Sequence, residues 1–304
     1  MNIHGLLVLD KPSGITSRDA VDRAARWFPR KTRIGHAGTL DPLATGVLVL
    51  GIGQATRLIE YVQAMSKVYE TRIVLGATSD TDDADGTIRV NEAASPVEED
   101  KLREAIARFV GEIEQTPPAY SAAHVAGRRA HQLARKGLEV VLAPRRVRID
   151  RIDVRDYAWP ILDLEVHCGK GTYIRSIARD LGALFGVGGY VAKLRRTRIG
   201  TFRVEDAVTL ETGPGVLLPM NTALSALPSI SIGEEEAKRL RFGKTIQAEG
   251  EGEVAVLDEL GELVAIGRIQ DGVLTSEKVI PLPAQEGRTF PNIVVESEEH
   301  QATS

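Results

Sequence analysis

A single carboxylate, that of Asp41, lies at the centre of a stretch whose residue types could carry out chemistry. Residues 35–48 read Gly-His-Ala-Gly-Thr-Leu-Asp-Pro-Leu-Ala-Thr-Gly-Val-Leu. Pro42 fixes its own φ and biases Asp41 towards an extended backbone, while the glycines permit tight turns and close approach of a ligand. The apolar run at 47–50 predicts a buried strand. Asp41 is therefore expected on a stiff loop that enters the core, although it could also be an ordinary turn residue, since Asp-Pro pairs favour turns.

Two further segments carry side chains that could assist a carboxylate. Residues 67–75 alternate as a strand and include Tyr69, which could equally be a core aromatic. Residues 162–175 predict a strand, a Gly-Lys-Gly turn and the start of a helix that carries Arg175. The turn lacks the spacing of a phosphate-binding P-loop. Arg175 could form an ordinary ion pair at the start of the helix, or it could grip a catalytic carboxylate with two N–H groups.

These segments together resemble the signatures of the pseudouridine synthases, and specifically of the bacterial tRNA pseudouridine-55 synthases (TruB family). The aspartate stretch at 35–48 matches throughout, and residues 169–175 and 190–197 match the second and third signatures. The resemblance extends from about residue 4 to residue 210. It is far more specific than a lone glycine motif.

The resemblance implies a role for each matching position. Asp41 would be the catalytic aspartate and Arg175 its ion-pair partner. Tyr69 would lie against the target base, where its ring offers a stacking face and its hydroxyl could carry a proton. The arginines after Leu194 would lie near phosphates, and Lys11 would help to shape the aspartate loop. The other substrate-binding residues implied are His36 against the displaced RNA, and Tyr173 and Leu194 lining and closing the uracil pocket, although a lone histidine is more often structural and Leu194 could be plain core.

The implied reaction breaks the C1′–N1 glycosidic bond of uridine, turns the base and rejoins it through C5. No redox change occurs and no group is added, so no cofactor and no metal are expected. A carboxylate can stabilise or capture a cationic sugar, as in glycosidases. A glycosidase usually needs two carboxylates, and only Asp41 stands out here. The chain could instead be a non-catalytic RNA-binding protein, or an RNA-guided relative that modifies ribosomal RNA; it lacks long basic tails, which favours the stand-alone enzyme.

Charge is distributed unevenly along the chain. The net charge is −4, but residues 126–203 hold 17 Lys and Arg against 7 Asp and Glu, an excess of +10, and residues 204–304 hold 7 against 18, a balance of −11. A basic middle can bind phosphates whatever the total charge, although it could also be a solvated face. The resemblance implies the T arm of tRNA as partner, and a monomer without an obligatory protein partner. No apolar run is long enough for a membrane span and no signal segment is recognised, so we expect a cytoplasmic protein. Cys168, the one cysteine, is expected to be a buried, inert thiol.

The predicted fold class is α+β. The resemblance implies a catalytic domain over 1–228 with a mixed, mostly antiparallel sheet flanked by helices, and a small PUA-like β-barrel over 229–283. Strands are expected at 253–257, 263–269 and 273–274. The polar, acidic residues 284–304 are predicted to be disordered.

Several local signals predict individual elements. Thr16 or Ser17 can cap a first helix, and residues 54–63 predict a second. Ser95-Pro96-Val97-Glu98 has the form of a capping box for a third. A basic helix is expected from about residue 128 to Gly137. The acidic run 80–86 fails the calcium-loop pattern and is interpreted as a turn-rich loop without metal.

Overall fold

The computed structural model describes residues 3–121, 124–125, 128–129 and 142–281. Its centre is a nine-stranded sheet in the order β1-β3-β12-β4-β11-β10-β7, with β2 paired to β3 and β13 paired to β12. The β12–β3 pair is parallel and its other ladders are antiparallel, which confirms the predicted mixed, mostly antiparallel sheet. The strands are β1 (Gly5–Lys11), β2 (Ile34–His36), β3 (Thr45–Ile52), β4 (Lys67–Leu75), β7 (Gly111–Gln115), β10 (Arg145–Ala158), β11 (Ile161–Cys168), β12 (Gly189–Ile199) and β13 (Phe202–Arg203).

One face of this sheet is covered by α1 (Ser17–Ala24), α3 (Glu99–Ala107) and α5 (Ile174–Leu184). Helix α1 shares an apolar cluster with residues of β1 and β3, and α3 and α5 share another with β4, β10, β11 and β12. The short 3₁₀ turn η1 (Ala25–Trp27) extends α1. Because paired residues of neighbouring strands point to the same face, the pairing of Arg196 with both Gly46 and Tyr69 places these three residues on the helix-covered face.

The opposite face divides into an apolar and a charged part. Turn η2 (Gly53–Leu58) and helix α2 (Ile59–Ala64) cover the β1–β3 end, together with η4 (Met220–Leu224) and the C-terminal module. The rest of this face carries ion pairs between side chains of different strands. They are Arg72 with Asp163 at 2.7 Å, Arg155 with Glu165 at 2.6 Å and, towards β1, Arg195 with Asp10 at 2.6 Å.

The C-terminal module is a five-stranded sheet in the order β14-β16-β17-β18-β15 with helix α6 (Glu234–Arg241) packed on it. Its strands are β14 (Ser229–Ser231), β15 (Ile246–Gln247), β16 (Gly252–Leu257), β17 (Leu263–Gln270) and β18 (Val273–Val279). The strands predicted here are confirmed, and β18 is longer than expected.

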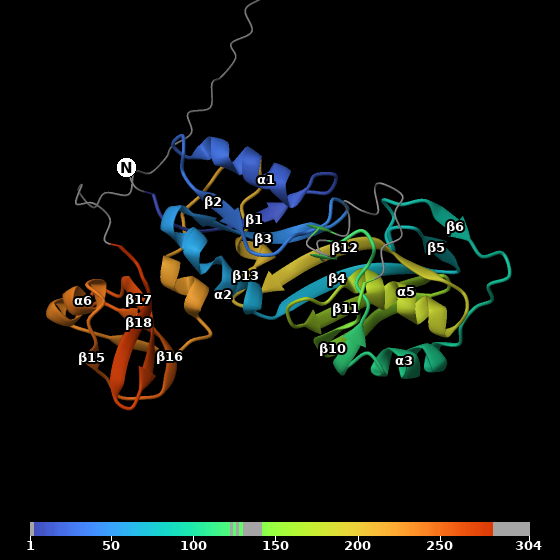
Figure 1. The fold of residues 1–304 in the computed structure, drawn as a ribbon. Coiled ribbons are helices and arrows are strands. Elements are labelled where there is room, and N and C mark those ends of the chain that lie inside the picture. The colour runs from blue at the N-terminus through green and yellow to red at the C-terminus, as the bar shows by residue number, and fades with distance from the viewer. Residues whose placement is uncertain (1–2, 122–123, 126–127, 130–141, 282–304) are drawn as a thin grey trace, which may run out of the picture.

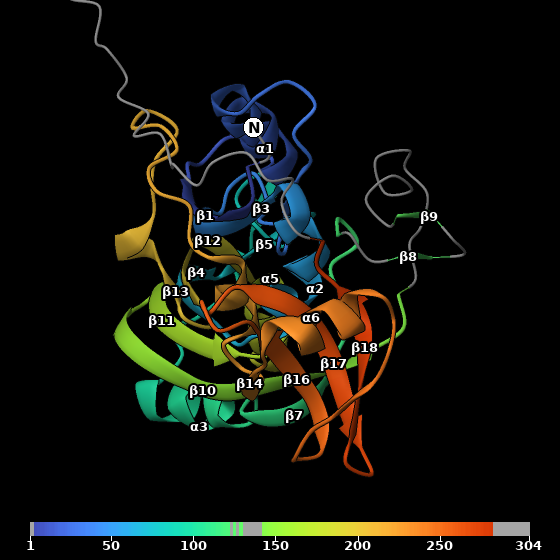
Figure 2. The same ribbon diagram turned by 90° about the vertical axis from the view of Figure 1, so that its left-hand side faces the viewer.

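The module packs beside α2 at one end of the molecule (Figures 1 and 2). The Tyr61 hydroxyl donates a 2.7 Å hydrogen bond to Glu253, and Lys278 pairs with Glu60 and lies over the Tyr61 ring. Ala255, Leu263, Ile266 and Ile280 of the module share a buried cluster with Leu58 and Val62 of the first part of the chain. The two parts are therefore joined by a common core.

Short elements complete the fold. They are β5 (Ala77–Ser79), β6 (Ile88–Val90), β8 (His124–Val125), β9 (Arg128–Arg129) and η3 (Val204–Asp206). Within the residues that the structure describes, no helix is long and apolar enough to cross a membrane.

Local predictions succeed where the signal is strictly local. Thr16, one of the two residues expected to cap the first helix, caps α1, and it does so in a capping box with Asp19. The capping box at residues 95–98 is wrong: α3 begins at Glu99 without a side-chain cap, and the Tyr157 hydroxyl instead donates to Val97 O at 2.6 Å. A tertiary contact thus outweighs the local motif at this position.

Two other predicted helices differ from the structure. The helix over 54–63 is 3₁₀ as far as Leu58 and α from Ile59. The start of the basic helix is wrong, because Arg128 and Arg129 form β9 and pair with β8. Its remainder at 130–137, and the predicted disordered tail at 284–304, lie outside the described residues.

Candidate active site

Asp41 lies on the loop between β2 and β3, and two neighbouring segments hold this loop through its backbone. The Ser17 hydroxyl donates to Leu40 O at 2.9 Å and accepts from Leu40 N at 2.8 Å. The Leu43 N–H donates to Asp85 Oδ2 at 3.0 Å. Ser17 opens α1, and Asp85 belongs to the acidic loop after β5, so the aspartate loop is fixed from both sides.

Lys11, the last residue of β1, also supports the aspartate loop. Its ammonium group donates to Pro12 O at 2.9 Å, to Ile15 O at 2.8 Å and to Pro42 O at 3.3 Å, and the residue is fully buried. Burial lowers the pKa of Lys11 to about 8, with Asp41 opposing the shift. Lys11 therefore has the loop-shaping position that the sequence predicted, and it also puts a cation near the carboxylate of Asp41.

Arg175 is the centre of an ion-pair network that includes Asp41. One terminal nitrogen, Nη2, lies 2.9 Å from Asp41 Oδ2 and donates to Tyr120 O at 2.9 Å. The other, Nη1, lies 3.1 Å from Asp83 Oδ2 and donates to Thr81 O at 2.8 Å. The Arg175 side chain is only 4% exposed, whereas that of Asp41 is 34% exposed. A buried guanidinium with four acceptors thus holds one oxygen of a carboxylate that solvent can still reach.

Asp83 was not recognised from the sequence, and it completes this network. The residue is 3% exposed, and its Oδ1 accepts hydrogen bonds from Thr81 Oγ1 at 2.6 Å and from the Asp85 N–H at 3.1 Å. Burial raises the pKa of Asp83 above the usual value, while the bond from Thr81 and the charge of Arg175 oppose the rise. The acidic loop that the sequence marked only as turn-rich therefore supplies a second carboxylate to Arg175.

Arg196 lies inside the protein, which corrects the expectation that both arginines of the third signature lie near phosphates. It is 1% exposed, and its guanidinium donates to Val47 O at 2.7 Å and to Gly38 O at 3.1 Å. Both acceptors flank the aspartate loop. Gly46 has a φ of +100°, and a Cβ there would collide with the backbone carbonyl of Arg196, so this close approach requires glycine. Arg195 forms an ion pair with Asp10.

Tyr69 and Leu194 lie beside the aspartate loop. Each is 9% exposed, and both belong to the apolar cluster that contains Leu40 and Ala44 of the aspartate loop. Burial raises the pKa of Tyr69, although Arg196 opposes the rise, so the phenol remains protonated at neutral pH.

His36 and Tyr173 lie near this network without joining it. Among the described residues, neither forms a hydrogen bond or ion pair with Asp41. His36 ends β2; burial lowers the pKa of its half-buried ring and the charge of Arg196 adds to the effect, so the imidazole is neutral at pH 7. Tyr173 is the N-cap residue of α5, and its backbone is bonded to the Gln115 side chain.

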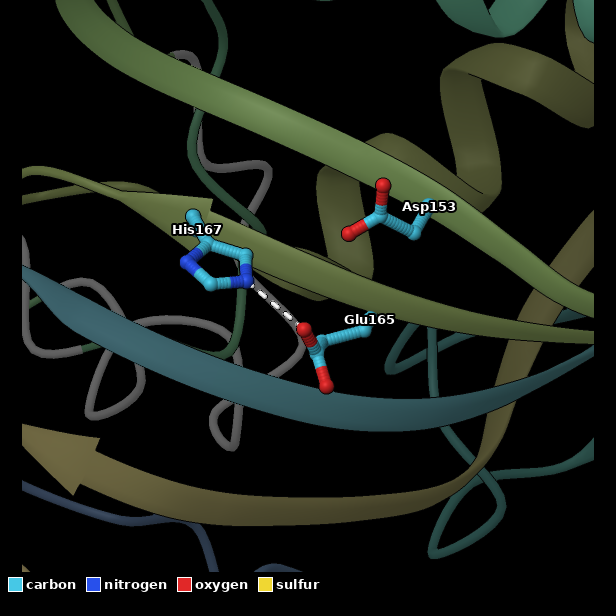
Figure 3. Close-up of side chains that lie close together, drawn as sticks. All are labelled: Asp153, Glu165 and His167. Atoms are coloured by element: carbon cyan, nitrogen blue, oxygen red, sulfur yellow. Dashed lines mark hydrogen bonds and ion pairs between the residues drawn. The ribbon is translucent and has the colours of Figure 1, made fainter.

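A cluster of possible metal ligands, Asp153, Glu165 and His167, lies on the charged face of the sheet (Figure 3). His167 and Glu165 are hydrogen-bonded at 2.7 Å. Arg151 lies 2.8 Å from Asp153, and Arg155 lies 2.6 Å from Glu165. Two guanidinium groups already neutralise these carboxylates, and the cluster lies on the side of the sheet opposite to Tyr69, so we assign it to the stability of the sheet.

The distribution of charge also differs from what the sequence alone led us to expect. Of the cations in 126–203 that the structure describes, six form ion pairs and Arg196 is bonded to the backbone. We did not predict a second basic segment, residues 23–33, from the sequence, because its excess of positive charge is confined to a short stretch. Its five cations are exposed and form no ion pair among the described residues; they are Arg23, Arg26, Arg30, Lys31 and Arg33.

Cys168 is buried, as predicted. Burial raises the pKa of its thiol to about 11. A protonated, enclosed thiol is a poor nucleophile, so Cys168 belongs to the core.

Residues 26–174 match the TruB family pseudouridylate synthase (N terminal domain). Residues 175–212 match the tRNA pseudouridylate synthase B C-terminal domain, and residues 228–280 match the pseudouridine synthase II TruB, C-terminal. The chain is 43% identical over 271 residues to the tRNA pseudouridine synthase B of Corynebacterium aurimucosum, covering 86% of this chain and 91% of that one. The protein of the same name from Corynebacterium diphtheriae is 44% identical over 280 residues, covering 88% and 92%.

Solved structures show the same fold. A chain of a Cbf5-Nop10-Gar1 complex superposes with a TM-score of 0.70 at 26% identity, covering 90% of this chain and 84% of that one. A chain of an H/ACA RNP bound to a substrate RNA containing 2′-deoxyuridine gives a TM-score of 0.68 at 25% identity, covering 91% and 85%. These matches extend over the sheet, its helices and the C-terminal module.

Proposed function

The chain belongs to the TruB family of pseudouridine synthases, and from that premise we propose how its residues isomerise uridine to pseudouridine at position 55, in the T loop of tRNA. The observation that carries the proposal is the network in which Arg175 joins Asp41 to Asp83. It gives a solvent-accessible carboxylate a fixed direction and a permanent counter-charge.

Asp41 is proposed as the catalytic residue. Its Oδ2 is held by Arg175, while Oδ1 accepts no hydrogen bond from the described residues, which leaves that oxygen for the substrate. The ionised carboxylate can capture the sugar at C1′, add to the base, or remove a ribose proton; all three start from the same charge state.

Tyr69 and Leu194 are proposed to enclose the extruded uracil. Extrusion of a base costs a few kcal/mol, and less from a loop than from a duplex. In this proposal the Tyr69 ring offers a face to the base, and its protonated hydroxyl moves a proton during the C5 step. His36 is proposed to lie against the displaced RNA, where stacking on an aromatic ring is worth about 1–3 kcal/mol per base. Tyr173 is assigned to the wall of the same pocket.

The exposed cations are proposed to bind the phosphates of the tRNA. The exposed cations of residues 23–33 come just before β2 in the sequence, and they therefore lie beside the strand that carries His36. The free cations of the basic middle extend the surface, among them Arg145 and Arg146 at the start of β10. Phosphate contacts of this kind position the RNA without reading its sequence.

We further propose that the enzyme works in the cytoplasm as a monomer without an obligatory protein partner or cofactor. The division into a catalytic domain, 1–228, and a PUA-like domain, 229–283, is retained as part of this proposal. The shared cluster around Leu58 and Leu263 supports a fixed arrangement of the two, so the PUA-like domain would present a constant surface to the tRNA.

The substitution Asp41→Asn tests the proposal. It removes the charge with little change in volume, so tRNA affinity should remain near normal while isomerisation falls to background. Filter binding and release of tritium from C5-labelled uridine in tRNA measure the two properties on one sample. The exposed Asp22→Asn serves as matched control. Substantial tritium release by Asp41→Asn would remove Asp41 from the chemistry, and wild-type protein that binds tRNA without releasing tritium would be a non-catalytic RNA-binding protein.

A further inference from the structure

Gln115 makes a paired contact whose purpose the proposed reaction does not explain. It is the last residue of β7 and is only 2% exposed. Its side-chain Nε2 donates to Tyr173 O at 3.0 Å, and its Oε1 accepts from the Tyr173 N–H at 2.8 Å. The amide therefore binds both backbone polar groups of one residue, as a neighbouring strand would.

Tyr173 is the residue at which β11's connection turns into α5. It has φ of −107° and ψ of 112°, and its own side chain makes no capping hydrogen bond. The N–H groups at a helix start need partners from outside the helix. Gln115 supplies one for the Tyr173 N–H and adds a second donor to Tyr173 O, which also accepts from Ile177 N at 3.3 Å; it thereby fixes the two peptide planes that flank Tyr173. Arg175 follows two residues later, so its Cα position depends on those planes.

The segment that begins with Gln115 continues to contact α5 beyond this point. Thr116 O accepts from Ser176 Oγ at 2.8 Å and from Arg179 Nη2 at 2.8 Å. Tyr120 O accepts from the same Arg175 nitrogen that holds Asp41. Ser176 is fully buried. We name the contact of Gln115 and Thr116 with Tyr173 and Ser176 the β7–α5 clamp.

We propose that Gln115 is a positioning residue for the isomerisation: through the β7–α5 clamp it sets the position of Tyr173 and of the Arg175 guanidinium that aims Asp41. This inference rests on the proposed function of Asp41 and Arg175. The clamp does not touch the reacting atoms. A glutamine suits it because one planar group offers a donor and an acceptor at the spacing of a peptide.

Gln115→Met tests the inference, because methionine has nearly the same length and volume but no comparable hydrogen-bonding groups. A displacement of about 1 Å in a reacting group can cost about 10²-fold in rate. We therefore expect kcat for tritium release from tRNA to fall by about 10- to 100-fold. The KM for tRNA should change by less than about two-fold, because the phosphate contacts lie elsewhere.

Asn91→Leu is the matched control. Asn91 is also an amide clamp on the backbone beside α5, but at the opposite end of that helix: its Nδ2 donates to Gly186 O at 3.2 Å and Val187 O at 3.3 Å, and its Oδ1 accepts from Ala93 N at 3.1 Å. It should lower the melting temperature about as much as Gln115→Met while leaving kcat unchanged.

Ser176→Ala provides a second, milder variant should Gln115→Met fail to fold. It deletes one of the two hydrogen bonds to Thr116 O and keeps that from Arg179, so it should lower kcat by a smaller factor, again at constant KM. A normal kcat in folded Gln115→Met, or in Ser176→Ala where that is the only variant that folds, would overturn the inference. So would an equal loss of kcat in Asn91→Leu, because the loss would then follow stability. If the wild-type protein itself releases no tritium, it is the proposed function that fails.

Discussion

Asp83→Asn is the sharpest test of the network around Arg175, because it changes one buried atom and leaves every loop in place. The asparagine oxygen can still accept from Thr81 Oγ1, but its NH₂ group would then face Arg175 Nη1, donor against donor. The variant therefore loses the 3.1 Å ion pair and gains a repulsive contact. Arg175 would retain Asp41 and two backbone carbonyls.

The size of the effect follows from these contacts. A hydrogen bond to a charged group is worth about 1.5–3 kcal/mol, and breaking a buried ion pair by removing one partner costs about 3–5 kcal/mol. Because Arg175 keeps three acceptors, we expect a loss of about 2–3 kcal/mol in unfolding free energy, equivalent to about 4–12 °C in melting temperature at about 2–4 °C per kcal/mol. A shift of the guanidinium by about 1 Å would lower kcat by about 10²-fold.

The assay is tritium release at saturating tRNA, with thermal unfolding measured on the same preparation. Asp80→Asn is the control: Asp80 lies in the same acidic loop, is exposed and, among the residues that the structure describes, accepts only from the Thr87 N–H, at 2.8 Å. It should be active. Full kcat in a folded Asp83→Asn protein would show that Arg175 aims Asp41 without a second carboxylate, and would refute the reasoning.

The same network predicts an acid limb in the pH profile. Burial raises the pKa of Asp83, so its ionised form is lost at a higher pH than that of an ordinary aspartate. Activity should therefore begin to fall above the usual aspartate range as the pH is lowered. The effect on stability has the opposite sign. Because the pKa of Asp83 is raised in the folded state, the folded state binds this proton at a higher pH than the unfolded state does, and protonation of Asp83 increases the free energy of unfolding. Asp83→Asn should remove both dependences, and a profile unchanged by the substitution would assign the limb to another group.

Three further predictions concern the surface, a buried lysine and the C-terminal module. The double substitution Arg30→Glu with Lys31→Glu should weaken tRNA binding and reduce the log–log salt slope by about 2, at about 0.9 per phosphate; an unchanged slope in filter binding would exclude the 23–33 segment. Burial lowers the pKa of Lys67 to about 8. Above that pH the folded chain has released the proton of Lys67, whereas the unfolded chain still binds it. Unfolding free energy from denaturant titrations should therefore contain a contribution that rises by about 2 kcal/mol between pH 8 and 10, at 1.36 kcal/mol per unit, and Lys67→Met should lack it. Tyr61→Phe removes the 2.7 Å bond to Glu253 and should cost about 1–2 kcal/mol, seen as a lower melting temperature of the whole chain if the two parts unfold together.

Much of the fold could be predicted from the sequence because its signals are local. Alternation identified β4 and β11, and glycine and proline punctuation placed the aspartate loop before β3. The cap of the first helix was predicted at Thr16 or Ser17, and Thr16 provides it, since a cap needs only a few consecutive residues. The similar pattern at Ser95 failed because the Tyr157 hydroxyl, from a strand far along the chain, holds Val97 in place. No sequence window contains that competitor.

The sequence by itself determined which residues were candidates, Asp41 and Arg175 foremost, because their neighbours match a known set of signatures. Only the tertiary structure decided how they are supported. Asp83 looked like one acid among several in a turn-rich loop, and Arg196 looked like a surface cation. Both are buried beside the aspartate loop because β12 runs parallel to β3 and the acidic loop folds over the start of α5. An ion without a partner is costly in a low-dielectric interior, so each buried charge is held by a partner in a fixed position. Which charges are buried depends on the packing between segments that are distant in the sequence.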